Sequence, residues 1–237
     1  MMQVIKQEFN DRVAEIGRYF HLLDNIIEKE AQLIFPNELD RREDFDFDLS
    51  GTLKSSAILL LYNLIEASVS KCLELIHQVV TQDKLMYDSV SDSIQKIWLA
   101  QFYERFRETG NKDENVLNNL KFMVDTLIRN NVAVELIYRD KEKRSSETSG
   151  ILDAKKIREI ADKYGIDFNK TSDKLKDIKD KRINLAHGIQ SFLDCCNTMT
   201  FKDLSFLKNE AIEFLEAFIF AVDAYLVDKK YKNKSSN

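Results

Sequence analysis

Proline and glycine are scarce in this sequence. Its 237 residues include one proline and six glycines, the two residue types that most often interrupt regular structure. Gly17 lies inside a segment of helical periodicity. The other glycines lie between such segments; they are Gly51, Gly110, Gly150, Gly165 and Gly188. Few breaks, placed mostly between periodic segments, predict an all-α chain.

Cysteine is scarce as well, and three residues are too few for a disulfide framework. This usage is typical of proteins from a reducing cytoplasm. Cys195 and Cys196 are adjacent and lack the spacing of zinc ligands, so we expect no metal site. The sequence also lacks a phosphate-binding glycine loop and a Gly-x-Ser-x-Gly elbow, and we expect no cofactor.

Long apolar runs are missing too. No stretch approaches the roughly 20 consecutive apolar residues that cross a bilayer. The N-terminal region carries the acidic residues Glu8 and Asp11, which are not typical of a signal peptide. We therefore expect a cytoplasmic protein without a membrane segment.

Charged residues are abundant, at 32% of the chain beside 44% hydrophobic residues, as in soluble folded proteins. The net charge of −5 does not indicate a nucleic-acid binder, but binding depends on a local patch and not on the sum. The length suits one buried core. We predict a single domain over residues 1–230 and a basic flexible tail over residues 231–237.

Helical periodicity covers most of the chain. The predicted helices span residues 3–34, 52–81, 90–108, 114–130, 154–164, 173–188 and 202–229. Between them, residues 37–50 are acidic and turn-like, with no regular structure expected. Residues 132–138 fit either a short extended segment or a continued helix. Residues 139–150 are predicted to form a charged loop insert.

The helix over residues 173–188 carries two residues that depart from its amphipathic pattern. Arg182 shares the apolar face with Ile178 and Leu185, where a permanent cation needs a partner or a water-filled cleft. His187 lies in the last turn, directly before Gly188, a residue suited to ending a helix. These two side chains are the candidate catalytic residues.

The segment Arg-Ile-Asn-Leu-Ala-His-Gly over residues 182–188 resembles the Arg-x4-His signature of the HEPN superfamily, and closely the form of its bacterial MAE-type members. The resemblance implies an all-α, HEPN-like bundle of long antiparallel helices with additional helices. It implies a symmetric homodimer that cleaves RNA as a metal-independent endoribonuclease. It also implies a role as a toxin or phage-defence effector, with a cognate antitoxin or defence-system protein as a further partner.

Two other residues belong to the candidate site. Leu-Tyr-Asn-Leu-Ile-Glu, which ends at Glu66, is similar to the Tyr-x3-Glu stretch of this group, where the acid often faces the active-site arginine. The alternative is that Glu66 reaches solvent from the flank of its helix. In the family a polar residue commonly follows the arginine directly; here Ile183 stands there and Asn184 comes one place later.

The residue types suit RNA cleavage by the 2′-hydroxyl of the RNA. Histidine exchanges protons near neutrality, and an arginine fork holds a phosphate through two parallel hydrogen bonds. Five positions on a straight helix separate Arg182 from His187 by about 140° and about 7.5 Å of rise. Such side chains do not lie side by side, which favours a composite site at the two-fold axis of a dimer.

A non-catalytic interpretation of the same residues is the alternative. Arg182 would pair with a buried acid such as Glu66, His187 would cap its helix, and the protein would be a non-catalytic interaction or nucleotide-binding module. Lysines on the same helix and just before it either contact RNA phosphates or form a solvated face; they are Lys170, Lys174 and Lys181. His21 and His77 are expected to be surface or hydrogen-bonded residues.

Overall fold

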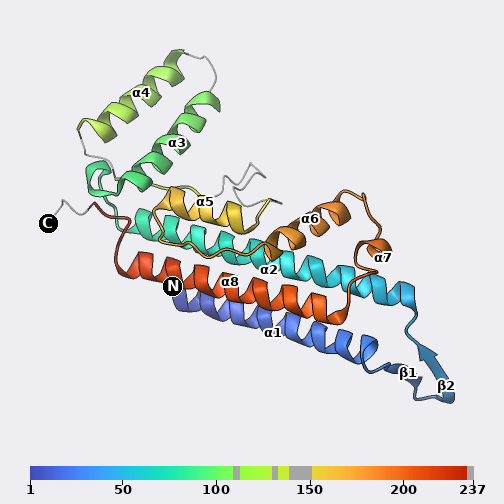
Figure 1. Ribbon diagram of the computed structural model, residues 1–237. Helices are drawn as coiled ribbons and strands as arrows, with labels where there is room; N and C mark the ends of the chain where they lie inside the picture. The colour runs from blue at the N-terminus through green and yellow to red at the C-terminus, as the bar shows by residue number, and fades with distance from the viewer. Residues whose placement is uncertain (109–112, 130–132, 139–150, 234–237) are drawn as a thin grey trace.

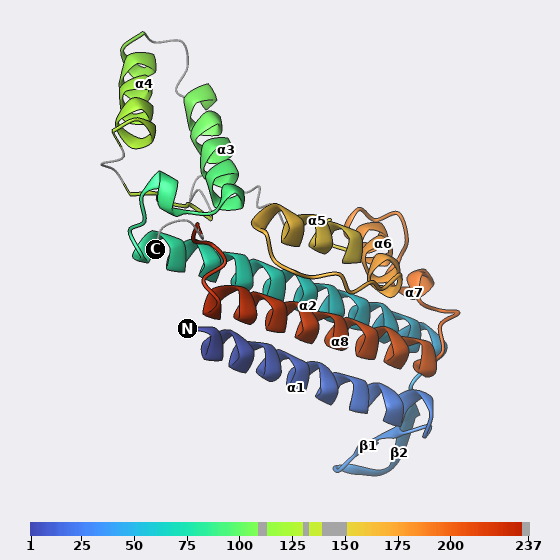
Figure 2. The same ribbon diagram turned by 60° about the vertical axis from the view of Figure 1, so that its left-hand side comes forward.

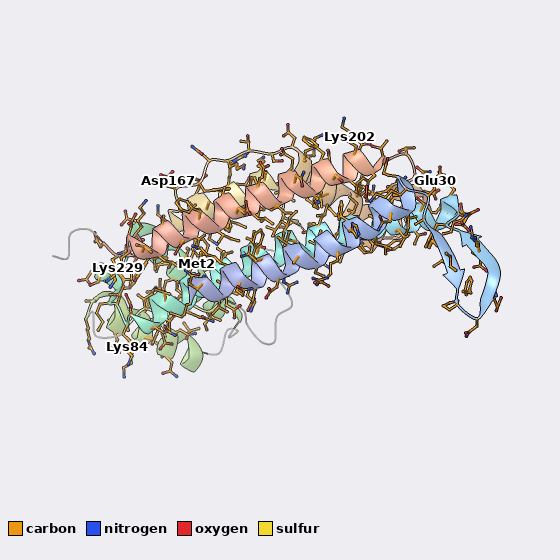
Figure 3. The ribbon with its side chains drawn as sticks, turned by 90° about the horizontal axis from the view of Figure 1, so that it is seen from below. Met2, Glu30, Lys84, Asp167, Lys202 and Lys229 are labelled. Carbon is orange, nitrogen blue, oxygen red and sulfur yellow. The ribbon has the colours of Figure 1, made fainter. Side chains whose placement is uncertain are left out.

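The computed structural model describes residues 1–108, 113–129, 133–138 and 151–233. Long helices form the body: α1 (Met2–Ile27), α2 (Phe47–Gln82) and α8 (Phe201–Val227), which pack against one another. α1 runs antiparallel to α2 and α8 (Figure 1). Seen from below, α1 and α8 lie side by side along their length (Figure 3). The predicted all-α bundle of long antiparallel helices is confirmed.

Shorter elements cover one side of this body. α5 (Ala154–Tyr164) and α6 (Lys174–Ala186) lie along α2, and α7 (Phe192–Cys195) packs on the first turns of α2. The 3-10 turn η1 (Tyr87–Ser89) leads into α3 (Asp92–Glu108), which with α4 (Asp113–Leu127) projects from one end of the body (Figure 2). Each additional helix predicted from the sequence is therefore present.

α2 is central because its apolar residues recur at helical spacing and face several neighbours. Ile58, Leu61, Ile65, Val69 and Ile76 are fully buried. Among the described residues α2 is also the one helix that is long and apolar enough to cross a membrane, with a mean hydropathy of 1.3 over 18 residues. The sequence analysis looked for an uninterrupted apolar run and found none. A mean over 18 residues tolerates single polar residues, so α2 meets this second criterion. Because 61% of the window is buried in the protein, α2 is a core helix.

Local signals in the sequence set several helix ends. Asp153 accepts a hydrogen bond from the Lys156 N–H and caps α5, which ends at Gly165 with a φ of 74°. Thr200 and Asp203 form the reciprocal hydrogen bonds of a capping box at the start of α8. These ends depend on residues within four positions, so the sequence indicates them directly.

The prediction for residues 28–50 was wrong. α1 ends at Ile27, and an antiparallel hairpin of β1 (Gln32–Phe35) and β2 (Glu38–Asp44) follows before α2 begins. The strands are short and exposed, and β2 is almost entirely charged, so the alternation of apolar and polar residues that marks a half-buried strand is missing. Arg41 ion-pairs with Glu38 and Glu43, and its guanidinium lies over the Phe35 ring.

The sequence left open whether residues 132–138 continue a helix or are extended. Residues 133–138 form no helix, which supports the extended alternative. Ala133 pairs with Met86 in an isolated bridge, and the Leu136 N–H donates to Thr81 Oγ1 at 3.0 Å. The predicted charged insert over residues 139–150 lies outside the described residues.

The first residues of the predicted tail are held to the body. Tyr231 is buried, and its hydroxyl donates to Asp83 Oδ2 at 2.9 Å. Lys232 ion-pairs with the same carboxylate at 2.8 Å. Residues 234–237 lie outside the described part, and the single-domain boundary stays a prediction.

Two helical glycines give opposite predictions for a change to alanine. A Cβ on Gly17 would meet nothing within 4 Å, so Gly17→Ala should raise the free energy of unfolding by about 0.5–1 kcal/mol. A Cβ on Gly51 would lie 2.8 Å from the Leu193 carbonyl oxygen, so Gly51→Ala should be destabilising because α7 must move. Urea unfolding of both variants measures the sign of each change in the free energy of unfolding. Equal stabilisation in the two would contradict the close packing of α7 on α2.

Candidate functional site

α6 positions both candidate catalytic residues. Leu175, Ile178 and Leu185 are buried and anchor the helix to the body. The helix ends in paired reverse hydrogen bonds: the Gly188 N–H donates to the Leu185 carbonyl and the Ile189 N–H to the Asn184 carbonyl. Gly188 has a φ of 67°, which glycine adopts without strain. His187 is therefore fixed at the exposed end of α6.

Arg182 lies against an aromatic ring. Its guanidinium carbon is 4.9 Å from the centroid of the Tyr62 ring of α2, and Tyr62 is fully buried. The arginine is half-buried, and in the described part of the chain it makes no ion pair and no side-chain hydrogen bond. The cation on the apolar face is thus accommodated by the electron-rich face of an aromatic ring.

Glu66 does not pair with Arg182 in the part of the chain that the structure describes, although both act on Tyr62. Burial raises the pKa of the Tyr62 phenol most; the Leu152 N–H lowers it, the Glu66 charge raises it and the Arg182 charge lowers it. The sequence left open whether Glu66 faces the arginine or reaches solvent. Its side chain is half-buried, which is intermediate between these alternatives. The acid and the arginine therefore lie near the same tyrosine without direct contact.

Within the described residues, no hydrogen bond or ring contact joins Arg182 to His187. Arg182 packs on α2, whereas His187 is exposed at the C-cap of α6. The polar residue between them, Asn184 in the last turn of α6, donates from Nδ2 to Gln190 Oε1 at 3.0 Å, and so links the helix to the turn that follows it.

The three lysines considered for RNA contact each have a partner within the chain. Lys170 donates to the Glu213 carbonyl, Lys174 to Asp177, and Lys181 to the Cys195 carbonyl. Lys174 and Lys181 also line a depression of about 400 Å³ between α6 and α8, together with three aspartates; these are Asp177, Asp180 and Asp203. Because three carboxylates outnumber two ammonium groups, the lining favours the solvated face over a phosphate groove.

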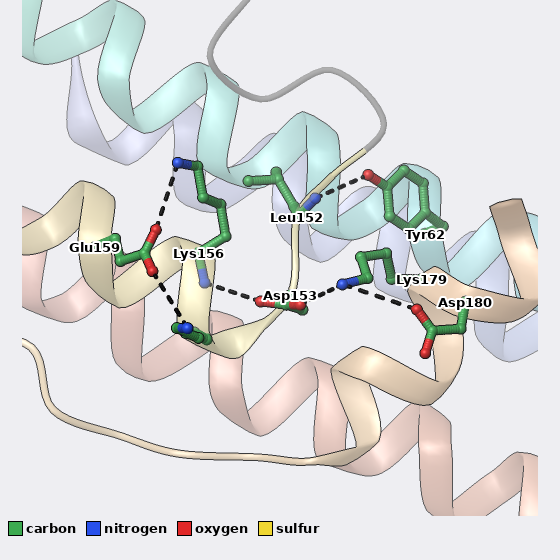
Figure 4. A network of polar contacts seen from close by, with 8 residues as sticks. Tyr62, Leu152, Asp153, Lys156, Glu159, Lys179 and Asp180 are labelled. Carbon is green, nitrogen blue, oxygen red and sulfur yellow. Dashed lines mark hydrogen bonds and ion pairs between the residues drawn. The ribbon is translucent and has the colours of Figure 1, made fainter.

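Residues Leu152 and Asp153 tie the helices of the site together (Figure 4). The Leu152 N–H donates to the Tyr62 hydroxyl at 3.2 Å, and Asp153 accepts from Lys179 Nζ of α6 at 2.5 Å. Burial raises the pKa of Asp153, but the hydrogen bonds from Lys179 and the Lys156 N–H outweigh it and hold this pKa below its usual value. The sequence analysis missed the contact of Asp153 with α6, because no local signal marks a contact across 26 positions.

The other histidines have the roles expected of them. His77 is buried, and its Nε2 lies 2.7 Å from the Tyr164 hydroxyl. Burial, aided by the charge of Lys163, lowers the pKa of His77 to about 4, so its ring is neutral near pH 7. His21 is exposed beside Asn25 on α1. Neither takes part in the candidate site.

The adjacent cysteines are buried, and burial raises the pKa of Cys195 to about 11, so the thiol stays protonated near neutral pH. Within the described ranges, no group of three or more His, Cys, Asp and Glu side chains is arranged to hold a metal ion.

Comparison with known proteins assigns this chain to a family. The MAE_28990-like HEPN family matches residues 1–231, which include α1 to α8 and the whole candidate site. No curated protein and no solved structure matches the chain. With the Arg-x4-His segment at the end of α6 and the all-α bundle around it, the chain belongs to the HEPN superfamily, in its MAE-like group.

Proposed function

We propose that this protein is a metal-independent endoribonuclease that acts in the cytoplasm as a toxin or phage-defence effector. Family membership supports a HEPN-type nuclease or effector in general. The observation that carries the proposal is the state of Arg182: a half-buried cation held by the Tyr62 ring, with no carboxylate paired to it among the described residues. Its hydrogen-bond donors are available for a phosphate.

The reaction needs proton transfer and charge stabilisation. The 2′-oxygen of a ribose attacks the adjacent phosphorus while its proton passes to a base, and the bond from phosphorus to the 5′-oxygen breaks as that oxygen takes up a proton. His187 is the residue proposed for proton transfer. The guanidinium of Arg182 stabilises the negative charge on the non-bridging oxygens. The products are a 2′,3′-cyclic phosphate and a 5′-hydroxyl.

We further propose that the working site is shared by two chains. Arg182 packs on Tyr62 of α2, whereas His187 is exposed at the C-cap of α6, so a phosphate bound by one chain's arginine is best reached by the histidine of a second copy. Exposed apolar side chains flank α6 and the Leu152 segment: Ile151 is 50%, Ile189 66% and Phe192 38% exposed. Such side chains favour burial against a partner surface. Glu66 and Asn184 are assigned supporting positions beside this site.

Mixed dimers test the shared site. Neither Arg182→Ala nor His187→Ala homodimers should cleave single-stranded RNA. A dimer purified through two different tags, with one change in each chain, holds one intact site and one doubly defective site. Its cleavage rate should be about half that of the wild-type dimer. The measurement is the initial rate on a labelled RNA, taken both without and with a chelator.

Three outcomes contradict parts of the proposal. An inactive mixed dimer would place both residues of a site in the same chain. Loss of wild-type cleavage on chelator addition would contradict metal independence. If pure wild-type protein and both variants leave RNA intact, the alternative of a non-catalytic interaction or nucleotide-binding module replaces the nuclease.

A further inference from the structure

We propose that Tyr62 is the positioning residue of the site: its buried ring holds the Arg182 guanidinium in place while leaving the N–H groups free for a phosphodiester. The inference deepens the proposed function and rests on it for the identity of the bound group. Its basis is the 4.9 Å approach of the guanidinium carbon to the ring centroid.

Contacts hold Tyr62 at both its ring and its hydroxyl. Its side chain is fully buried in the seam of α2. Its hydroxyl accepts the Leu152 N–H at 3.2 Å, and the next residue, Asp153, binds Lys179 of α6 (Figure 4). The ring is therefore fixed relative to both helices, α2 by its backbone and α6 through Asp153. A ring in a fixed position favours one position of the Arg182 guanidinium.

The choice of a ring over a carboxylate has a chemical consequence. A guanidinium is planar, and its five N–H donors point outward in that plane. A carboxylate partner would take two of these donors and compete with a phosphate for them. An aromatic ring attracts the cation without accepting those hydrogen bonds. Arg182 is thus held in position, yet its donors and its charge remain available to the RNA.

Removing the ring should therefore weaken phosphate binding. A cation–π contact of this kind corresponds to about 2- to 30-fold in an equilibrium constant. We expect Tyr62→Leu to weaken binding of a 2′-O-methyl oligoribonucleotide, which cannot undergo 2′-oxygen attack, by about that factor. Tyr62→Phe keeps the ring, loses the hydrogen bond to Leu152, and should bind within about threefold of the wild-type protein.

A spectroscopic readout tests the contact independently of activity. In the wild-type protein and in Tyr62→Phe, NMR resonances of the Arg182 side chain should be shifted upfield by the ring current. The shift should vanish in Tyr62→Leu, and Arg182→Lys identifies the resonances by their loss. Tyr225→Leu is the matched control: Tyr225 is also a buried tyrosine of the bundle, on α8, and its ring packs near that of Tyr231. It should change stability but neither the Arg182 resonances nor the affinity.

The outcomes separate this inference from the nuclease proposal. Absence of RNA cleavage by wild type, with the upfield shift and the affinity loss both present, removes the nuclease and keeps the positioning role. Unshifted Arg182 resonances in the wild-type protein overturn the positioning role, whatever the activity. So does an affinity loss in Tyr225→Leu equal to that in Tyr62→Leu, because the effect would then follow from lost stability alone.

Discussion

His187→Ala is expected to slow RNA cleavage by about 10²- to 10⁴-fold, the usual contribution of a positioned acid–base group. The same change should alter the free energy of unfolding by less than about 1 kcal/mol, because the His187 side chain is exposed. The measurements are single-turnover cleavage of a single-stranded RNA and urea unfolding of the same preparations. A large kinetic effect without a stability effect is the signature of a catalytic group.

His21→Ala is the matched control for this variant. His21 is also exposed, and it lies on α1 beside Asn25 and away from α6. It should leave both cleavage and stability unchanged. If His187→Ala cleaves RNA at the wild-type rate, His187 is only a helix cap and the proposed chemistry loses its proton-transfer group.

Phe218→Ala should lower the free energy of unfolding by about 3–5 kcal/mol. Phe218 of α8 is fully buried, and its ring meets that of Phe168 edge-on at 5.3 Å between centroids. Phe168 belongs to the connection from α5 to α6, so this contact also fastens the helix of the candidate site to the body. The cavity left by the ring cannot close fully in a packed core, which is why the loss exceeds the transfer free energy alone.

Phe220→Ala provides the comparison within the same helix. Phe220 lies two residues further on and is 70% exposed, so its removal should cost less than about 0.5 kcal/mol. Chemical unfolding of both variants under one set of conditions gives the difference directly. Similar losses at the two positions would contradict the orientation of α8 in the bundle.

The sequence predicted the long helices well because each carries a periodic apolar face. In α2, Ile58, Leu61 and Ile65 recur at helical spacing, and all three are buried. α8 shows where periodicity is insufficient: its apolar arc is wider than one stripe, and of its extra residues Ile219 is buried whereas Phe220 is exposed. The arrangement of neighbouring helices decides between such residues. The β1–β2 hairpin was missed because charged, exposed strands carry no apolar alternation.

By itself, the sequence determined the features that depend on neighbouring residues: the all-α class, the caps at Asp153 and Thr200, and the presence of an arginine and a histidine on one short helix. The tertiary structure alone decided what these residues meet. It placed Arg182 on the Tyr62 ring instead of on Glu66. Such partners depend on how α6 is rotated against α2, and that rotation results from the joint packing of buried side chains from distant segments.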